Sequence, residues 1–216
     1  LNLLNELDGD EMKYKIFFML AVYGGMRKGE ILGLEWKDID FDYCTIDIMR
    51  SSLYTPKTKT GSGQMTNQGK GTYTDTPKTK GSVRTLKLPD FIFDMLREYK
   101  QWQDGQRTAL GDQWQDYDRL FTCYNGAPMS PSTPSNWLTR FQTKNGLRRV
   151  TTHSFRHLNA SILIYENLDA KTVSAYLGHS NVTTTLDIYT HEFNRAKARS
   201  SDALTKAIDL NPKKKK

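Results

Sequence analysis

Apolar residues at helical spacing dominate this chain on both sides of one short β-rich stretch, and this pattern restricts the fold class most. Between Glu11 and Gly24 they recur every three or four positions, which predicts a helix with one apolar face. That face comprises Tyr14, Phe17, Phe18, Ala21 and Val22. Further helices are predicted over residues 27–34, 90–108, 132–144, 154–165, 170–177 and 182–189.

The β-rich stretch lies between these helices and is split by a polar segment. Residues 45–49 and 85–88 have the composition of short strands. Residues 55–76 are rich in Thr, Gly, Lys and Gln, and are interpreted as a loop or a loosely structured insert. Residues 76–88 are interpreted as a β-hairpin with Gly81 near its turn. Many helices with one small early sheet favour the α+β class over α/β.

The chain is long enough for one large domain with its own core, or for two small ones. It has 216 residues, of which 37% are hydrophobic. No apolar run approaches the roughly 20 residues of a membrane span, and the acidic first residues lack the basic start of a signal peptide. Cys44 and Cys123 alone make neither a disulfide framework nor a zinc site. A cytoplasmic protein with free thiols is expected, and the absence of an initiating methionine indicates a fragment of a longer protein.

The charge balance favours a polyanionic partner. Thirty-one Lys and Arg residues against 24 Asp and Glu give a formal charge of +7, which suits nucleic acid. The signal is weak alone, because part of the excess is the terminal run of four lysines, and such runs are usually solvated tails.

The first segment that carries chemistry is GGMRKGE, which contains Arg27 and Glu30. An arginine at a helix start after two glycines can direct its fork into a cleft, where it matches two non-bridging phosphate oxygens. Glu30 lies one helical turn further on, close enough to orient that arginine. The ordinary alternative is a surface helix with an Arg–Glu ion pair.

The second segment is HSFRH, which contains His153, Arg156 and His157. The first two are three positions apart and project from one helix face. Histidine can move protons near neutral pH, whereas arginine keeps its charge, so the pair can hold a phosphate and shuttle a proton. His157 is interpreted as structural, pointing elsewhere. The alternative for the whole segment is a helix N-terminus with a satisfied histidine.

The third segment runs from LGH to IYTH and contains His179 and Tyr189. His179 follows Gly178, where a helix is expected to end. A tyrosine needs help to attack phosphorus, because its free pKa is near 10. That help is a base for its proton and positive charge around the phosphate. The alternatives are a half-buried aromatic and a capping or core histidine.

Together, the three segments resemble the tyrosine recombinase family, the phage and mobile-element integrases. The resemblance extends from about Glu11 to Glu192, and the motif order matches. It implies a mostly α-helical α+β catalytic domain with a small antiparallel sheet over residues 1–192. Residues 193–216 would form a C-terminal helix and basic tail that is exchanged between protomers. The N-terminal DNA-binding domains of the family are expected to lie outside this sequence.

The resemblance also implies a mechanism, in which Tyr189 attacks the scissile phosphate and forms a 3′-phosphotyrosine. Five further residues assist it. Arg27 and Arg156 clamp the non-bridging oxygens, Lys80 protonates the leaving 5′-oxygen, His153 accepts the tyrosine proton, and His179 donates a hydrogen bond to the phosphate. Glu30 positions Arg27. Neither a catalytic metal nor ATP is expected, because the arginines supply the positive charge and the covalent bond conserves the phosphate energy.

The family places its lysine in a β-hairpin, and here the segment TPKTKGSVRTLKLP offers two. Lys80 is assigned because it precedes the turn glycine, and Lys78 remains an alternative. Contacts to the DNA backbone are expected from basic residues of the insert and the hairpin. These are Lys57, Lys59, Lys70, Lys78 and Arg84.

The expected partners are double-stranded DNA, three further copies of the chain in a tetramer on paired sites, and an accessory directionality factor. No membrane partner is expected. Three rival functions remain: a type IB topoisomerase, a non-catalytic DNA-binding relative, and a metal-dependent DDE transposase. For the last, Asp38, Asp40 and Asp42 would be ligands, although alternating acids are usually one solvated face of an extended segment.

Overall fold

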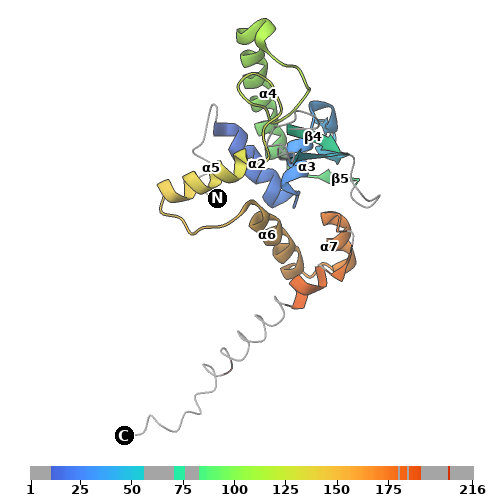
Figure 1. Ribbon diagram of the computed structural model, residues 1–216. Helices are drawn as coiled ribbons and strands as arrows, with labels where there is room; N and C mark the ends of the chain where they lie inside the picture. Colours follow the sequence, from blue (N-terminus) through green and yellow to red (C-terminus); the bar gives the residue numbers. More distant parts are fainter. Residues whose placement is uncertain are drawn as a thin grey trace, which may run out of the picture.

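The computed structural model describes residues 11–55, 71–75, 83–179, 181–183, 185–190 and 204. Its helices are α2 (Met12–Tyr23), α3 (Lys28–Gly33), α4 (Asp90–Leu110), α5 (Thr133–Lys144), α6 (Thr152–Tyr165) and α7 (Ala170–Leu177). Its strands are β1 (Ile39–Asp40), β2 (Thr45–Ile48), β3 (Ser51–Thr55), β4 (Gly71–Asp75) and β5 (Arg84–Lys87). Short 3₁₀ turns occupy Trp36–Asp38 and Gly111–Gln113. The α+β class with a small antiparallel sheet is confirmed (Figure 1).

The helices predicted between residues 11 and 177 are confirmed, with ends that differ by no more than two residues from the predicted ones. Apart from Leu204, the C-terminal helix predicted within residues 193–216 lies outside the described residues. Residues 183 and 185–190 are helical as well. Among the described residues, no helix combines the length and apolarity that crossing a membrane requires.

Helix α2 lies at the centre of the molecule and is buried on nearly every side (Figure 1). The sequence pattern predicted one apolar face, but every residue from Ile16 to Val22 is buried. The reason is that α4, α5 and α6 all pack against this helix. Its aromatic side chains meet those of other elements, as Tyr14 does by stacking on Trp137 of α5 at a centroid distance of 4.5 Å. The main hydrophobic core therefore forms around α2.

The described strands form two antiparallel sheets. Strands β1, β2 and β5 form a three-stranded sheet in the order β1-β2-β5. Ile46 of β2 pairs with Leu86 of β5, and both side chains are buried in the core. The predicted strand near residues 85–88 is thus confirmed, and it pairs with β2. The other half of the hairpin predicted over residues 76–88, residues 76–82, lies outside the described residues.

The polar segment 55–76 was interpreted as loop or insert, and its last part is instead a strand. Residues 71–75 form β4, which pairs with β3 from Ser51↔Asp75 to Thr55↔Gly71. Residue composition missed this strand because glycine and aspartate are rare in strands, and the backbone hydrogen bonds of a long hairpin do not depend on apolar side chains.

Buried polar groups help to attach α6 to the end of α2, beside the aromatic contact of Phe18 with Phe155. Asn159 of α6 donates to the carbonyl oxygens of Val22 and Tyr23 at the end of α2, at 2.7 and 3.2 Å. A small second core of Ala160, Val173 and Leu177 holds α6 and α7 together. The chain needs glycine at position 25, where φ is +56° and a Cβ would lie 2.5 Å from Leu177 Cδ2. The turn after α2 can therefore approach α7 closely.

Candidate active site

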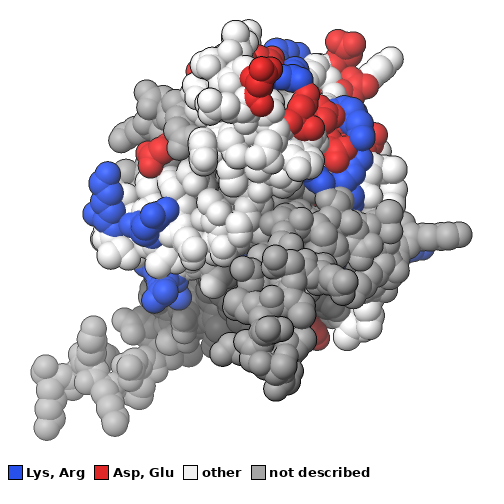
Figure 2. Space-filling model, turned by 45° about the horizontal axis from the view of Figure 1, so that its top comes forward, with Lys and Arg blue, Asp and Glu red and all other residues white. Residues whose placement is uncertain are grey.

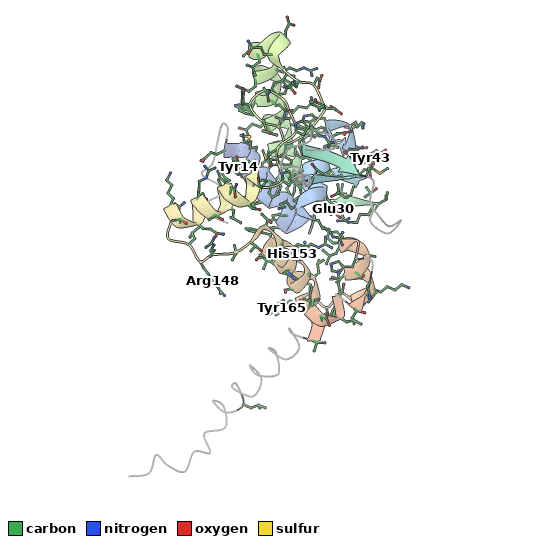
Figure 3. The ribbon with its side chains drawn as sticks, in the orientation of Figure 1. Tyr14, Glu30, Tyr43, Arg148, His153 and Tyr165 are labelled. Atoms are coloured by element: carbon green, nitrogen blue, oxygen red, sulfur yellow. The ribbon has the colours of Figure 1, made fainter. Side chains whose placement is uncertain are left out.

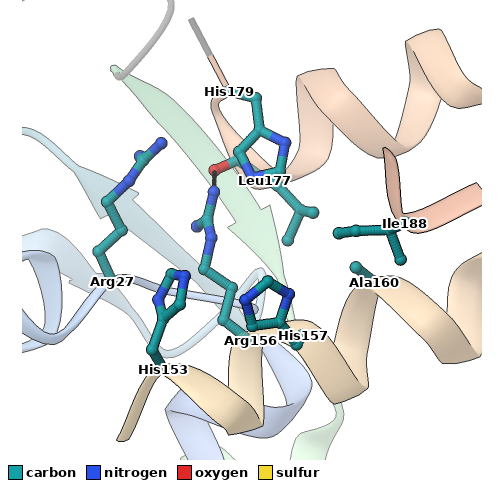
Figure 4. A pocket seen from close by; sticks show the side chains of 8 residues that line it. All are labelled: Arg27, His153, Arg156, His157, Ala160, Leu177, His179 and Ile188. Carbon is teal, nitrogen blue, oxygen red and sulfur yellow. Dashed lines mark hydrogen bonds between the residues drawn. The ribbon is translucent and has the colours of Figure 1, made fainter. Parts of the chain in front are cut away.

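A cavity of about 210 Å³ lies where α3, α6 and α7 meet. Eight side chains line it, and Figure 4 shows them converging from these elements and from the helical residues after α7. They are Arg27, His153, Arg156, His157, Ala160, Leu177, His179 and Ile188. Four of the six residues expected to act in catalysis are among them. The cavity is thus polar and cationic at one end and apolar at the other.

Arg27 occupies the N-cap position of α3, directly after the glycine turn. Its Nη1 donates to Glu30 Oε1 at 2.7 Å, and its backbone N–H donates to Oε2 of the same carboxylate at 2.9 Å. Its Nη2 donates to the carbonyl oxygen of Gly178 at 2.8 Å. The side chain remains 39% exposed. Glu30 therefore orients the arginine, as the three-residue spacing predicted, and leaves part of its guanidinium open to a ligand.

Arg156 is the buried cation of the site, with an exposed fraction of 3%. Its Nη1 donates to the Gly25 carbonyl oxygen at 2.5 Å and its Nη2 to that of Leu177 at 2.7 Å. Burial, followed by the positive charge of Arg27, lowers the pKa of Arg156 to about 9. The guanidinium still carries its charge at neutral pH, so the cavity keeps two adjacent cations.

His157 belongs to the site, although the sequence interpretation made it structural. It lines the cavity, and its ring meets that of His153 edge-on at a centroid distance of 4.6 Å. The signal was present in the spacing, because positions i and i+4 lie on the same helix face just as i and i+3 do. Burial, followed by the charges of His157, Arg156 and Arg27, lowers the pKa of His153.

His179 follows the left-handed Gly178 that ends α7, as predicted. Its Nδ1 lies 2.7 Å from the hydroxyl oxygen of Thr185, which is fully buried. That contact fixes the ring and leaves Nε2 as the nitrogen for a ligand in the cavity. Burial, followed by the charges of Arg156 and Arg27, lowers the pKa of His179 to about 4.

We expect the His179 ring to stay neutral in the folded chain at pH 5, where an ordinary histidine is mostly protonated. The unfolded chain binds this proton near pH 6.5 and the folded chain only near pH 4. This group therefore contributes stability that is complete above pH 6.5 and is lost as the pH falls toward 4. An NMR titration of the histidine ring signals measures the pKa directly. A midpoint for His179 near 6.5 would contradict the electrostatics described above.

Tyr189 lies beside the cavity but does not line it. Ile188, the preceding residue, is in the lining, whereas the Tyr189 hydroxyl is buried outside it and has no hydrogen-bond partner among the described residues. Burial, followed by the negative charge of Asp169, raises the pKa of this phenol. The expected nucleophile thus directly follows a residue of the cavity lining, but its own side chain is not part of that lining.

Arg84 was expected to contact the DNA backbone, but its side chain is directed into the protein rather than exposed on the surface. Its side chain is 8% exposed and forms an ion pair with Glu30, with Nη2 2.9 Å from Oε2. The expected lysines fall outside the described residues. These are Lys57, Lys59, Lys70, Lys78 and Lys80.

Two of the three aspartates that were considered as metal ligands, Asp38 and Asp40, stabilise the nearby backbone. Asp38 pairs with Arg50 and accepts from the Glu35 backbone N–H at 2.8 Å, and Asp40 accepts from the backbone N–H groups of a turn. Within the described ranges, no group of three or more potential metal ligands occurs.

The chain belongs to the phage integrase family, whose sequence profile matches residues 1–195. It is 31% identical over 195 residues to a XerC-like tyrosine recombinase of Caldanaerobacter subterraneus, covering 89% of this chain and 49% of that protein. It is 29% identical over 195 residues to the ICEBs1 integrase of Bacillus subtilis, covering 90% of this chain and 49% of the relative. The chain thus spans about half the length of these relatives.

Solved structures share the fold. The Tn1549 transposon integrase in complex with circular intermediate DNA matches with a TM-score of 0.69 and 23% identity, covering 94% of this chain and 64% of that one. The XerH site-specific recombinase bound to its difH substrate, a post-cleavage complex, matches with a TM-score of 0.61 and 20% identity, covering 94% of this chain and 49% of the other. At these identities the likeness establishes the fold.

Proposed function

We propose that this chain is the catalytic domain of a site-specific DNA recombinase that integrates or excises a phage or another mobile element. The observation that carries the proposal is the convergence of two arginines and three histidines on one cavity. Arg27 and Arg156 reach it from helices far apart in the chain, and the turn at Gly25 binds Arg156 across 131 positions. Such a cluster fits the oxygens of a single phosphodiester.

The reaction proposed at this cavity is transesterification. The Tyr189 oxygen attacks the scissile phosphorus, the bond to the 5′-oxygen breaks, and a 3′-phosphotyrosine forms. The phenol proton passes to His153, and Lys80 gives a proton to the leaving 5′-oxygen. Attack by a 5′-hydroxyl of another strand reverses these steps and releases the tyrosine. The arginines stabilise the charge that builds on the non-bridging oxygens in both directions, so no catalytic metal is needed. The covalent bond to tyrosine conserves the phosphodiester energy, so no ATP is needed.

Cleavage then requires a movement of the helical residues 185–190. The hydroxyl of Tyr189 is buried outside the cavity, while Ile188 already faces it. A small rotation or shift of this segment brings the phenol among the cations, where its ionisation becomes more favourable. We propose that binding of DNA and assembly with other copies of the chain drive this movement.

A basic surface on α5 and the loop after it supports DNA as the substrate. Residues 133–152 contain no acidic residue, and four exposed cations lie among them. They are Arg140, Lys144, Arg148 and Arg149. Figure 2 shows Lys and Arg on this side with few acids nearby, whereas acids and bases are intermixed at the top of the view, and Figure 3 shows Arg148 pointing outward from the loop. We call these four residues the α5 basic surface.

Removing two charges of the α5 basic surface should weaken DNA binding and its dependence on salt. Each phosphate contact contributes about 0.9 to the slope of log K against log salt, so Arg148→Ala/Arg149→Ala should reduce that slope by about 2. The matched control is Lys100→Ala/Arg107→Ala, which changes the charge equally but removes cations that already pair with acids. Fluorescence anisotropy at several salt concentrations measures both. Equal slopes for the two double variants would contradict a DNA contact at this surface.

The wider assembly is also a proposal. We propose that four copies of the chain assemble on paired DNA sites in the cytoplasm. In each copy, residues 1–192 would form the catalytic domain, and residues 193–216 would be exchanged between protomers. An accessory factor would set the balance of integration and excision. Joining of two duplexes that each carry the site tests recombination, because a topoisomerase relaxes DNA without joining separate sites. A chain truncated before Phe193 that still assembles on DNA would contradict the exchange.

A further inference from the structure

We propose that Arg84 is a positioning residue that holds Arg27 and the end of α7 in place for DNA cleavage. Arg84 lies on β5 and does not line the cavity. All three nitrogens of its guanidinium nevertheless donate to groups that adjoin cavity residues, namely the Glu30 carboxylate and the carbonyl group of Tyr176. Its Nη2 and Nη1 donate to Glu30 Oε2 and Oε1 at 2.9 and 3.3 Å. Its Nε donates to the carbonyl oxygen of Tyr176 at 2.9 Å. The inference rests on the proposed cleavage activity.

Glu30 is the first group that Arg84 holds. Its two oxygens are shared between two arginines, because Oε1 also accepts from Arg27 Nη1 at 2.7 Å and Oε2 from the Arg27 backbone N–H at 2.9 Å. A carboxylate bound on one side only can rotate about its χ angles, whereas a two-pronged contact with a second guanidinium fixes its plane. The orientation of Arg27 toward a phosphate thus depends on Arg84 through a shared, nearly buried anion.

The end of α7 is the second group. Three successive carbonyl oxygens, at residues 176–178, accept hydrogen bonds from three arginines. The donors, in that order, are Arg84 Nε at 2.9 Å, Arg156 Nη2 at 2.7 Å and Arg27 Nη2 at 2.8 Å. The last carbonyl groups of a helix have no partner within the helix and form its negative end, so cations bind there favourably. The residue after them is His179, whose position therefore depends on the same contacts.

Charge explains why an arginine is needed at this position. Arg27 and Arg156 repel each other across the cavity, and Glu30 is the buried anion beside them. Burial raises the pKa of Glu30, but the hydrogen bond and charge of Arg84, followed by the hydrogen bonds of Arg27, leave this pKa below its ordinary value. A lysine at position 84 would retain the charge, but a single ammonium group cannot reach both Glu30 oxygens and the α7 carbonyl in one plane.

The position of Arg84 in the chain links these contacts to the leaving-group lysine. Strand β5 begins at Arg84, only four residues after Lys80. Anchoring this residue on Glu30 and α7 fixes the start of the strand that follows Lys80 in the sequence. One side chain thus connects the three parts of the proposed machinery: α3, the end of α7 and the strand that follows the lysines.

The test compares Arg84→Lys with Arg119→Lys in the full 216-residue chain. Arg119 is the matched control because its side chain is equally buried at 8%, and it too binds a carboxylate and a helix-end carbonyl, those of Glu35 and Gly33. It is not among the residues that line the cavity. Three quantities are measured: thermal unfolding, DNA affinity across salt concentrations, and the single-turnover rate of covalent adduct formation at saturating DNA.

We expect both variants to lose similar stability and to retain the affinity and salt slope of the parent chain. Arg84→Lys should form adduct about 10- to 100-fold more slowly, because a misplaced catalytic group costs on this scale, while Arg119→Lys should react at the parent rate. Equal adduct rates for the two variants would overturn the positioning role. A reduced affinity and salt slope in Arg84→Lys with a normal saturated rate would overturn it too, and would identify Arg84 as a DNA contact.

A second measurement needs neither DNA nor cleavage, so it separates this inference from the proposed function. The Nε–Hε NMR signal of Arg27 reports the ion pair with Glu30. It should shift in Arg84→Lys and stay unchanged in Arg119→Lys. If the parent chain forms no adduct, the proposed cleavage activity fails, while the NMR comparison still decides whether Arg84 positions Arg27. An unchanged Arg27 signal in Arg84→Lys would overturn the inference.

Discussion

Replacing Tyr189 by phenylalanine should abolish the covalent protein–DNA adduct completely while leaving DNA binding intact. The substitution removes the single oxygen that is proposed to bond to phosphorus, and phenylalanine keeps the apolar packing of the ring. The adduct is measured on a nicked suicide substrate, from which the cleaved end diffuses away and traps the covalent intermediate. The assay is run in EDTA, so that an adduct with the parent chain also establishes cleavage without a divalent metal.

The control is Tyr165→Phe, which removes a tyrosine hydroxyl from the exposed end of α6 (Figure 3). This variant should form adduct at the parent rate. An adduct that persists in Tyr189→Phe would mean that another of the 11 tyrosines is the nucleophile. Because the hydroxyl of Tyr189 is buried outside the cavity, we also expect adduct formation to depend on the concentration of the chain on DNA, since assembly is proposed to move this residue.

Replacing Arg27 by alanine should slow cleavage by about 10² to 10³-fold at saturating DNA. Loss of one fixed donor to a developing oxyanion costs roughly 3 to 4 kcal/mol of activation free energy, and Arg27 is the more exposed of the two guanidinium groups in the cavity. Single-turnover kinetics on the suicide substrate measure this rate. DNA affinity should change little, because one phosphate contact among many is lost.

The control for Arg27→Ala is Arg97→Ala on α4. Both arginines are partly exposed, at 39% and 48% of the side chain, and both pair with an acid three positions away. Arg97 does not line the cavity, so its removal should leave the cleavage rate unchanged. A rate for Arg27→Ala close to that of Arg97→Ala would exclude Arg27 from catalysis, whatever the position of its side chain in the free protein.

The helices were predictable because their signals are local. Apolar spacing, the glycine pair at Gly24 and Gly25, and the glycine before His179 each act within one or two helical turns. Strand pairing was less predictable. Strand β4 is polar and pairs with β3 across an insert, and β5 pairs with β2 at a sequence separation of about forty residues. Such pairings are decided by the whole sheet rather than by the composition of one segment.

Sequence patterns alone were sufficient to predict the family, the helices and those cavity residues that motif spacing identifies, among them Arg27, Arg156 and His179. The surroundings of three other side chains became visible only in the folded chain. His157 lines the cavity, Arg84 pairs with Glu30 across 54 positions, and the Tyr189 hydroxyl is buried and is not part of the cavity lining. The physical reason is that spacing along a helix fixes the face a residue occupies, whereas the direction of a long or buried side chain depends on partners that folding brings from distant parts of the chain.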